Sequence, residues 1–114
     1  MIRFLLCALL VTAAGSAFAA DVQHGKQVFE QCAACHGGET APSLVGVIGR
    51  KAGSLEEFRY SPAMKRSAIL WDEAMVKAFV MNPQGVVKGT RMPFDGLREE
   101  HDAEDVAAYV ATLK

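Results

Sequence analysis

Two cysteines and a histidine stand close together in the sequence Cys32-Ala33-Ala34-Cys35-His36. This spacing sets two thiols about one helical turn apart, so both can add to the vinyl groups along one edge of a haem. The next side chain then offers an imidazole nitrogen to the iron. The pattern predicts one covalently bound c-type haem, attached through Cys32 and Cys35, with His36 as an axial ligand.

Three other chemistries use similar residues. A thioredoxin-like redox pair needs a βαβ context, and the chain has no run of β-branched residues long enough for a parallel strand. A zinc site would need further paired ligands, and only His24 and His101 remain, far apart in the sequence. A disulfide between the two cysteines would close a loop too small to stabilise much. A zinc or disulfide module remains an alternative, which the absence of a c-type haem spectrum would favour.

The N-terminal residues have the composition of a secretory signal peptide. Arg3 precedes an unbroken apolar run, residues 4–11, which is too short to span a bilayer. The triplet Ala17-Phe18-Ala19 matches the small-residue signal for cleavage. We expect residues 1–19 to be a cleavable signal peptide and residues 20–114 to be the mature domain, exported to the periplasm of a bacterium. An uncleaved membrane anchor is the alternative.

Length and charge limit the remaining possibilities. The chain has 114 residues and a formal net charge of −1 at pH 7, which indicates one domain and gives no sign of nucleic-acid binding. Removal of residues 1–19 would cost one of the 12 basic residues and none of the 13 acidic residues. A mature domain of this size buries little surface by itself, so a large apolar cofactor would complete its core.

The mature part reads as helices joined by loops. Helix caps and apolar residues at helical spacing predict four helices, at residues 22–36, 62–67 and 73–81 and from Asp102 to the C-terminus, the last with Asp102 as its cap. Asp105 would add negative charge to the first turn of that last helix. Residues 83–97 are predicted to be a loop. Gly25, inside the first helix, indicates a close approach of another backbone. His24 and His101 are predicted to be solvated.

Several segments after the haem motif extend the pattern over most of the mature chain. Together they resemble class I cytochrome c, closest to the mitochondrial and bacterial cytochrome c2-like branch; the segments are GVIGRKAG (46–53), FRYSPAM (58–64), LWDE (70–73), NP (82–83) and GTRMPF (89–94). The resemblance implies an all-α fold in which the N- and C-terminal helices cross. Short helices and loops would wrap around one covalent haem.

The resemblance also implies roles for single residues. Met92 matches the methionine of the family's G-T-K-M segment, so Met92 is expected to be the second metal ligand, opposite His36. Apart from the resemblance, Pro42 should lie near His36, so its carbonyl could accept the Nδ1 proton of that ligand, although spacing alone favours an ordinary turn proline. Four further residues are expected to bind the haem propionates: Arg50, Tyr60 and Trp71 one of them, and Thr90 the other.

These features predict a soluble, monomeric one-electron carrier of a respiratory chain. If both axial positions are filled by protein, no position remains for a substrate, so the protein is not expected to be an enzyme. Expected partners are a quinol–cytochrome c reductase, a cytochrome oxidase or a periplasmic dehydrogenase, without nucleic acid and without stable membrane insertion after cleavage. The alternative is a haem c enzyme or gas-binding protein with a displaceable sixth ligand. Phe79 stands where many relatives carry a tyrosine, which removes one polar group near the expected methionine ligand.

Overall fold

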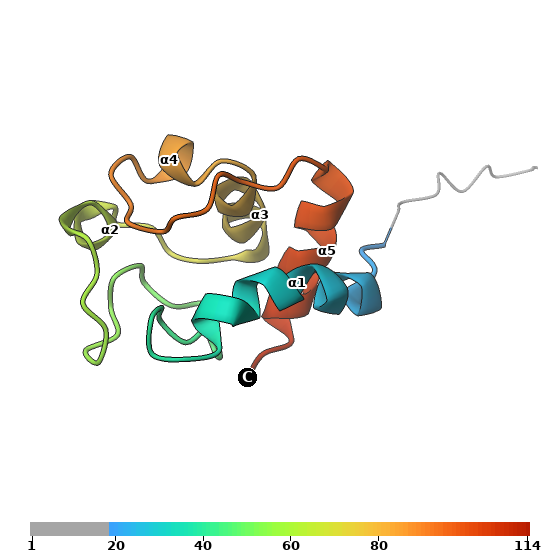
Figure 1. The fold of residues 1–114 in the computed structure, drawn as a ribbon, viewed down its shortest axis with the longest axis horizontal. Helices are drawn as coiled ribbons and strands as arrows, with labels where there is room; N and C mark the ends of the chain where they lie inside the picture. The colour runs from blue at the N-terminus through green and yellow to red at the C-terminus, as the bar shows by residue number, and fades with distance from the viewer. Residues whose placement is uncertain (1–18) are drawn as a thin grey trace, which may run out of the picture.

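Five helices joined by long loops make up residues 19–114, the part of the chain that this computed structural model describes (Figure 1). The helices are α1 (Val22–His36), α2 (Pro62–Arg66), α3 (Glu73–Met81), α4 (Pro83–Val86) and α5 (Glu100–Ala111). Within these residues there is no strand, only an isolated bridge between Lys51 and Leu70. The all-α prediction is confirmed. The predicted signal peptide lies outside the described residues, apart from its last residue.

Local sequence explains where α1, α2 and α3 begin. The side chains of Asp21, Ser61 and Asp72 each accept a hydrogen bond from the backbone N–H three residues later, at 3.1, 3.1 and 2.7 Å. Each bond satisfies one of the N–H groups that the first turn of a helix leaves without a partner. Pro62 follows its cap directly, where a proline costs no hydrogen bond. Three of the four predicted helices therefore begin where the caps indicated.

Helices α1 and α5 cross at Gly25. A Cβ atom at this position would lie 2.0 Å from the carbonyl oxygen of Asp105 and 2.9 Å from the Cβ of Tyr109, so only glycine allows this approach. Next to the crossing, the rings of Phe29 and Tyr109 pack at 5.1 Å between centroids. The close approach predicted for Gly25 is confirmed, and α5 lies across α1 in Figure 1.

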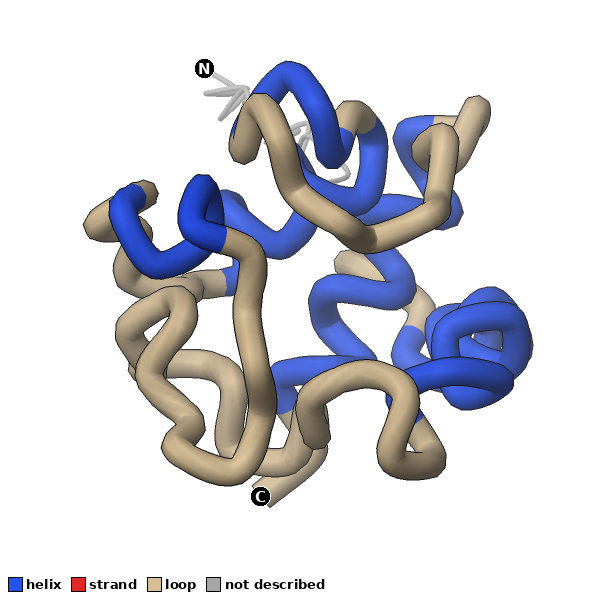
Figure 2. Tube along the Cα trace, turned by 60° about the vertical axis from the view of Figure 1, so that its left-hand side comes forward, coloured by secondary structure: helices blue, strands red, loops and turns tan. Residues whose placement is uncertain are grey.

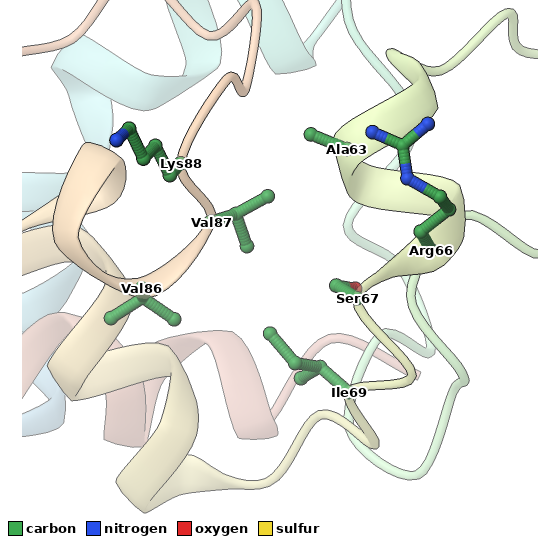
Figure 3. A pocket seen from close by; sticks show the side chains of 7 residues that line it. All are labelled: Ala63, Arg66, Ser67, Ile69, Val86, Val87 and Lys88. Atoms are coloured by element: carbon green, nitrogen blue, oxygen red, sulfur yellow. The ribbon is translucent and has the colours of Figure 1, made fainter.

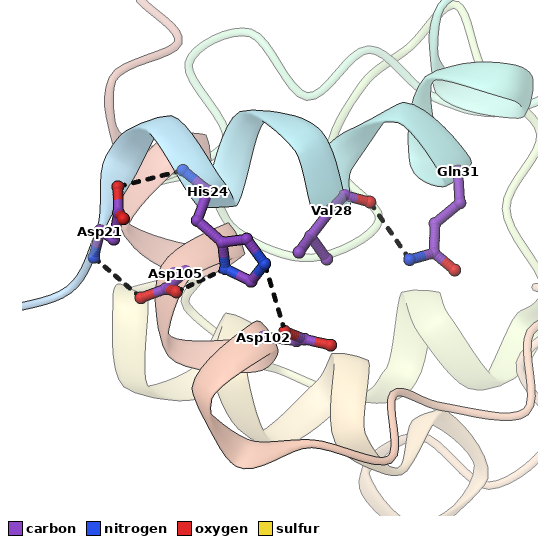
Figure 4. A network of polar contacts seen from close by, with 6 residues as sticks. All are labelled: Asp21, His24, Val28, Gln31, Asp102 and Asp105. Carbon is purple, nitrogen blue, oxygen red and sulfur yellow. Dashed lines mark hydrogen bonds and ion pairs between the residues drawn. The ribbon is translucent and has the colours of Figure 1, made fainter.

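A polar network ties the same two helices together at their outer ends (Figure 4). The carboxylate of Asp105 accepts a hydrogen bond from the backbone N–H of Asp21 at 2.8 Å and contacts Nδ1 of His24 at 2.7 Å. Nε2 of His24 lies 3.7 Å from Asp102. The prediction that His24 is solvated is therefore incomplete, because three acidic residues contact its ring and its backbone amide.

The last helix begins earlier than the sequence predicted. Its N-cap is Glu99, which makes no side-chain cap bond, and Asp102 lies inside the first turn. Asp105 is buried at 7% exposure rather than a surface charge of that turn, because its carboxylate is occupied by α1. Both carboxylates face α1: Asp105 bonds to it, and Asp102 lies 3.7 Å from Nε2 of His24.

The segment predicted as a loop from residue 83 to 97 begins with a short helix. Asn82 ends α3 and then caps α4, accepting a hydrogen bond from the backbone N–H of Gly85 at 3.1 Å. Pro83 is at the first position of α4, where its missing N–H is not needed. The prediction was wrong for residues 83–86, since Gly85 and Pro83 read as loop residues although the cap makes one helical turn possible.

The hydrophobic core lies where α1, α3 and α5 meet. Val28, Val76, Phe79, Val106 and Val110 are all at least nine-tenths buried there. On the surface, Lys77 of α3 pairs with Glu100 and Glu104 of α5 at 2.8 and 2.9 Å.

Long loops fill the space around the helices. In Figure 2 they form most of the lower left, and further loops cross the upper right and the lower right beside the helices. No helix among residues 19–114 is both long and apolar enough to cross a membrane.

Candidate haem site

The imidazole of His36 is held at the C-terminal end of α1. Its Nδ1 lies 2.7 Å from the carbonyl oxygen of Pro42, so the ring donates there when the proton is on Nδ1. That tautomer leaves Nε2 with a free lone pair, as a metal ligand requires. The predicted hydrogen bond is present, and it fixes both the tautomer and the orientation of the ring.

Cys32 and Cys35 lie on the last turn of α1, just before His36. Cys32 is half-buried and Cys35 is exposed, and neither forms a disulfide in the structure. Burial raises the pKa of the Cys32 thiol, with a smaller contribution from the neighbouring Cys35. Helical geometry sets the two sulfur atoms on the same side of α1, as attachment to one edge of a flat macrocycle needs.

The segment that carries Met92 lies across the middle of the molecule from the end of α1. In Figure 1 the end of α1 lies below this middle, and the chain from α4 towards α5 runs above it. Met92 is partly buried and packs against the core, and Thr90 is 7% exposed. The backbone N–H of Met92 donates to Oγ1 of Thr90 at 3.4 Å.

A hydrogen bond between two loops ties the segment around Met92 to the loop that carries Tyr60. Nη2 of Arg91 donates to the carbonyl oxygen of Tyr60 at 2.8 Å. Arg91 occupies the lysine position of the family motif and here acts as a link between two loops. Tyr60 itself is 9% exposed, with its ring against Phe58 at 5.0 Å between centroids.

Arg50 and Trp71 come together through their backbones. The Trp71 N–H donates to the Arg50 carbonyl at 3.0 Å, and the ring of Trp71 packs against Phe79 at 5.2 Å between centroids. The guanidinium of Arg50 donates to the carbonyls of Ser43 and Val45 at 2.8 and 2.5 Å, which uses two of its five N–H groups.

The residues present fit a haem, judged by their polar and apolar groups. The hydroxyl of Tyr60 and the indole N–H of Trp71 bond to no atom of residues 19–114, and since no side-chain polar atom of these residues is both buried and unpaired, both groups are open to solvent although the two residues are more than nine-tenths buried. Such groups suit a carboxylate such as a haem propionate, since a buried carboxylate needs donors around it. Several partly buried apolar side chains pack against the core beside them, among them Leu44, Ile48, Met64, Ile69 and Met92.

A pocket opens between α2 and the segment that follows α4 (Figure 3). Its lining is mostly apolar at the centre, where Ala63, Ile69 and Val87 point inward, and Arg66 and Lys88 stand at its edges. None of the nine predicted site residues lines it. The pocket therefore lies between α2 and the segment after α4, and it is not the predicted haem site.

Comparison with known proteins agrees with this geometry. The sequence profile of the cytochrome c family matches residues 22–114. The chain belongs to the cytochrome c family. It is 47% identical over 111 residues to cytochrome c2 of Rhodomicrobium vannielii, covering 92% of this chain and 89% of that protein. It is 44% identical over 110 residues to cytochrome c-554 of Methylosinus trichosporium, covering 91% and 83%. Among solved structures, cytochrome cH from Methylobacterium extorquens matches with a TM-score of 0.77 at 36% identity, covering 82% of this chain and 99% of that chain.

The family establishes the cofactor and the general role of this cytochrome. It carries one haem c, bound covalently through two cysteines, and within residues 19–114 the cysteines are Cys32 and Cys35. It is a class I, cytochrome c2-like electron carrier and not an enzyme. The predictions of fold, cofactor and electron transfer are confirmed.

One residue near the site was missed by the sequence reading. Gln84 of α4 bonds with both ends of its side-chain amide to the loop that carries Met92. A glutamine gives no signal for such a role, because its partners are backbone atoms. The Asp105–His24 contact was missed for a different reason, since the two residues are 81 positions apart.

Proposed function

We propose that this cytochrome is a periplasmic one-electron carrier in which His36 and Met92 are the two axial ligands of the haem iron. Haem c supplies an iron atom that is stable in two oxidation states one electron apart. The observation that carries the proposal is the bond from His36 to Pro42 at 2.7 Å, which presents Nε2 as a ligand, together with a half-buried methionine on the facing loop.

The ligand assignment has a physical basis in the surroundings of each methionine. Met64 and Met75 lie within helices α2 and α3, and Met81 ends α3, where methionine serves as packing. Met92 lies in an irregular segment after a glycine at φ +94°, which can carry a thioether over a haem face. A thioether favours Fe(II), so His/Met ligation predicts a higher reduction potential than His/His.

The remaining predicted residues would hold the cofactor by its propionates. Arg50, Tyr60 and Trp71 offer N–H and O–H donors to one carboxylate, and Thr90 would offer its hydroxyl to the other. Phe79, packed on Trp71, keeps the interior apolar where many relatives carry a hydroxyl. Apolar side chains packed around the haem would move little between the two oxidation states, as a one-electron carrier requires.

Partners of acidic character are supported by the distribution of charge. Of the 11 basic residues in residues 19–114, seven lie in the segments 50–66 and 88–91, which contain only two of the 13 acidic residues. These segments are neighbours, since Arg91 bonds to Tyr60 and the side chains of Arg66 and Lys88 line one pocket. An acidic redox partner, such as a reductase, an oxidase or a dehydrogenase, would be attracted to this side.

The test of the ligand assignment is the sulfur-to-iron charge-transfer band of the oxidised protein in the far red. Met92→Ala should abolish this band and lower the reduction potential, while the haem stays attached through Cys32 and Cys35. Met64→Ala is the matched control and should retain the band. If the band survives in Met92→Ala and disappears in Met64→Ala, the assignment is wrong.

Export is tested separately. We propose that residues 1–19 are removed and that residues 20–114 form the mature, monomeric domain. N-terminal sequencing of the holoprotein from a bacterial periplasmic fraction should then begin at Ala20. A holoprotein that begins at Met1 and sediments with membranes would contradict both the cleavage and the location.

A further inference from the structure

Gln84 lies on the surface of α4, yet both ends of its side-chain amide are used. Nε2 donates to the carbonyl oxygen of Thr90 at 2.8 Å, and Oε1 accepts from the backbone N–H of Gly89 at 3.0 Å. With the amide turned over, each bond would set donor against donor or acceptor against acceptor, so the hydrogen bonds fix its orientation. One side chain therefore spans two consecutive residues of the backbone.

The backbone that Gln84 holds leads directly to Met92. Gly89 is exposed and has φ +94°. Because glycine has no side chain, it cannot anchor the segment by packing, and its backbone is a flexible link. Other ties of this segment are the Thr90 N–H to the Val87 carbonyl at 3.0 Å and the Arg91 bond to Tyr60 at 2.8 Å. The bond from the Met92 N–H to Thr90 is long, at 3.4 Å.

We propose that Gln84 is a positioning residue for the Met92 thioether: its two bonds keep the segment 89–92 in the conformation that presents the sulfur to the iron. The inference rests on the proposed role of Met92 as ligand. Without these bonds the segment samples more conformations, and the thioether leaves ferric iron more often. An added ligand such as imidazole binds only when the sulfur has left, so its apparent affinity reports that fraction.

The size of the effect follows from the two hydrogen bonds. A pair of ordinary bonds corresponds to a change of about tenfold in an equilibrium constant. Imidazole should therefore bind about tenfold more tightly to the ferric holoprotein when Gln84 is replaced by Ala. Gln84→Glu keeps the size of the side chain and the acceptor for Gly89 but sets a carboxylate against the Thr90 carbonyl, so it should also bind imidazole more tightly.

The controls are the same substitutions at Gln23, an exposed glutamine of α1 whose side chain bonds to no atom of residues 19–114. Gln23→Ala and Gln23→Glu should bind imidazole as the wild type does, which separates charge and composition from position. The measurement is the change in the visible haem spectrum as imidazole is added, which reports binding with or without Met92, well below the temperature at which any variant unfolds.

A double substitution distinguishes positioning from a general loosening of the fold. In a Met92→Ala background, Gln84→Ala should leave the imidazole affinity unchanged, because no thioether competes. An equal effect of Gln84→Ala with and without Met92 would overturn the inference, and so would a wild-type affinity in both Gln84 variants. If Met92→Ala loses the far-red band while the Gln84 variants stay unchanged, only the positioning role fails. If the band survives in Met92→Ala, the ligand assignment fails as well.

Discussion

Replacing Gly25 by alanine adds one methyl group at the place where α1 and α5 touch. That group would lie 2.0 Å from the Asp105 carbonyl oxygen, whereas ordinary contact begins at 3.4 Å. The obstacle is backbone, which cannot rotate away, so the helices must separate by about 1 Å or more. A gap of that size forfeits a quarter to a half of each dispersion contact across the interface.

The separation also stretches the bonds from Asp105 to the Asp21 N–H and to His24. Overpacking costs about 1–3 kcal/mol, and weakening the bond from the Asp21 N–H costs about 0.5–1.5 kcal/mol. The better helix propensity of alanine returns about 1 kcal/mol. We therefore expect Gly25→Ala to reduce the free energy of unfolding by about 2 kcal/mol, which lowers the melting temperature by about 8–16 °C in a domain of this size.

The assay is thermal unfolding of the holoprotein, followed by far-UV circular dichroism in one oxidation state. Gly38→Ala is the matched control, because a Cβ atom there meets nothing within 4 Å and the residue has no positive φ. It should melt within a few degrees of the wild type. If Gly25→Ala unfolds at the temperature of the control, the close crossing does not determine how the helices pack.

Three further predictions concern pH, cofactor and charge. The hydrogen bond to Asp105 is the largest of the effects that raise the pKa of His24 above its ordinary value of 6.5. This contact therefore stabilises the fold below pH 6.5, and the stabilisation is lost as the pH rises through the folded-state pKa. His24→Gln should flatten the pH dependence of the free energy of unfolding in that window, and an unchanged pH profile would contradict this. Cys32→Ala with Cys35→Ala should leave a chain without cooperative unfolding, since a ligand bound only by the native state stabilises it, and a sharp transition in haem-free material would refute this. Lys65→Glu with Arg66→Glu should slow association with an acidic redox partner and weaken its dependence on salt more than Lys26→Glu does, and equal effects would show that the basic side is not the one approached.

The carboxylate of Asp105 adds a lower limit to the pH window. Burial raises the pKa of Asp105, but the hydrogen bonds from His24 and from the Asp21 N–H outweigh it, so the net pKa lies below the usual value. A group with a lowered folded-state pKa stabilises the fold above its unfolded pKa and loses this effect as the pH falls through the folded pKa. The contact between Asp105 and His24 is therefore strongest in mildly acidic solution, where one partner is deprotonated and the other protonated.

The sequence by itself determined the features that depend on neighbouring residues. Helix caps act over three residues, so Asp21, Ser61 and Asp72 predicted three helix starts. The haem attachment motif is equally local, because two thiols and an imidazole at this spacing are compatible with few kinds of site other than a c-type haem. The bond from His36 to Pro42 spans only six residues, so the sequence could suggest it, but spacing alone favoured an ordinary turn proline and the structure decided between the two.

Only the tertiary structure decided which polar side chains reach across the fold. Asp102 and Asp105 read as charges at the start of a helix, but they face α1, and no local pattern shows a partner more than 70 residues away. No sequence pattern indicated the contacts of Gln84 and Arg91, yet Gln84 holds the backbone of Gly89 and Thr90 and Arg91 bonds to the Tyr60 carbonyl, all just before Met92. Their partners are backbone carbonyl and N–H groups, which every residue possesses, so their positions follow from how the chain packs and not from residue type.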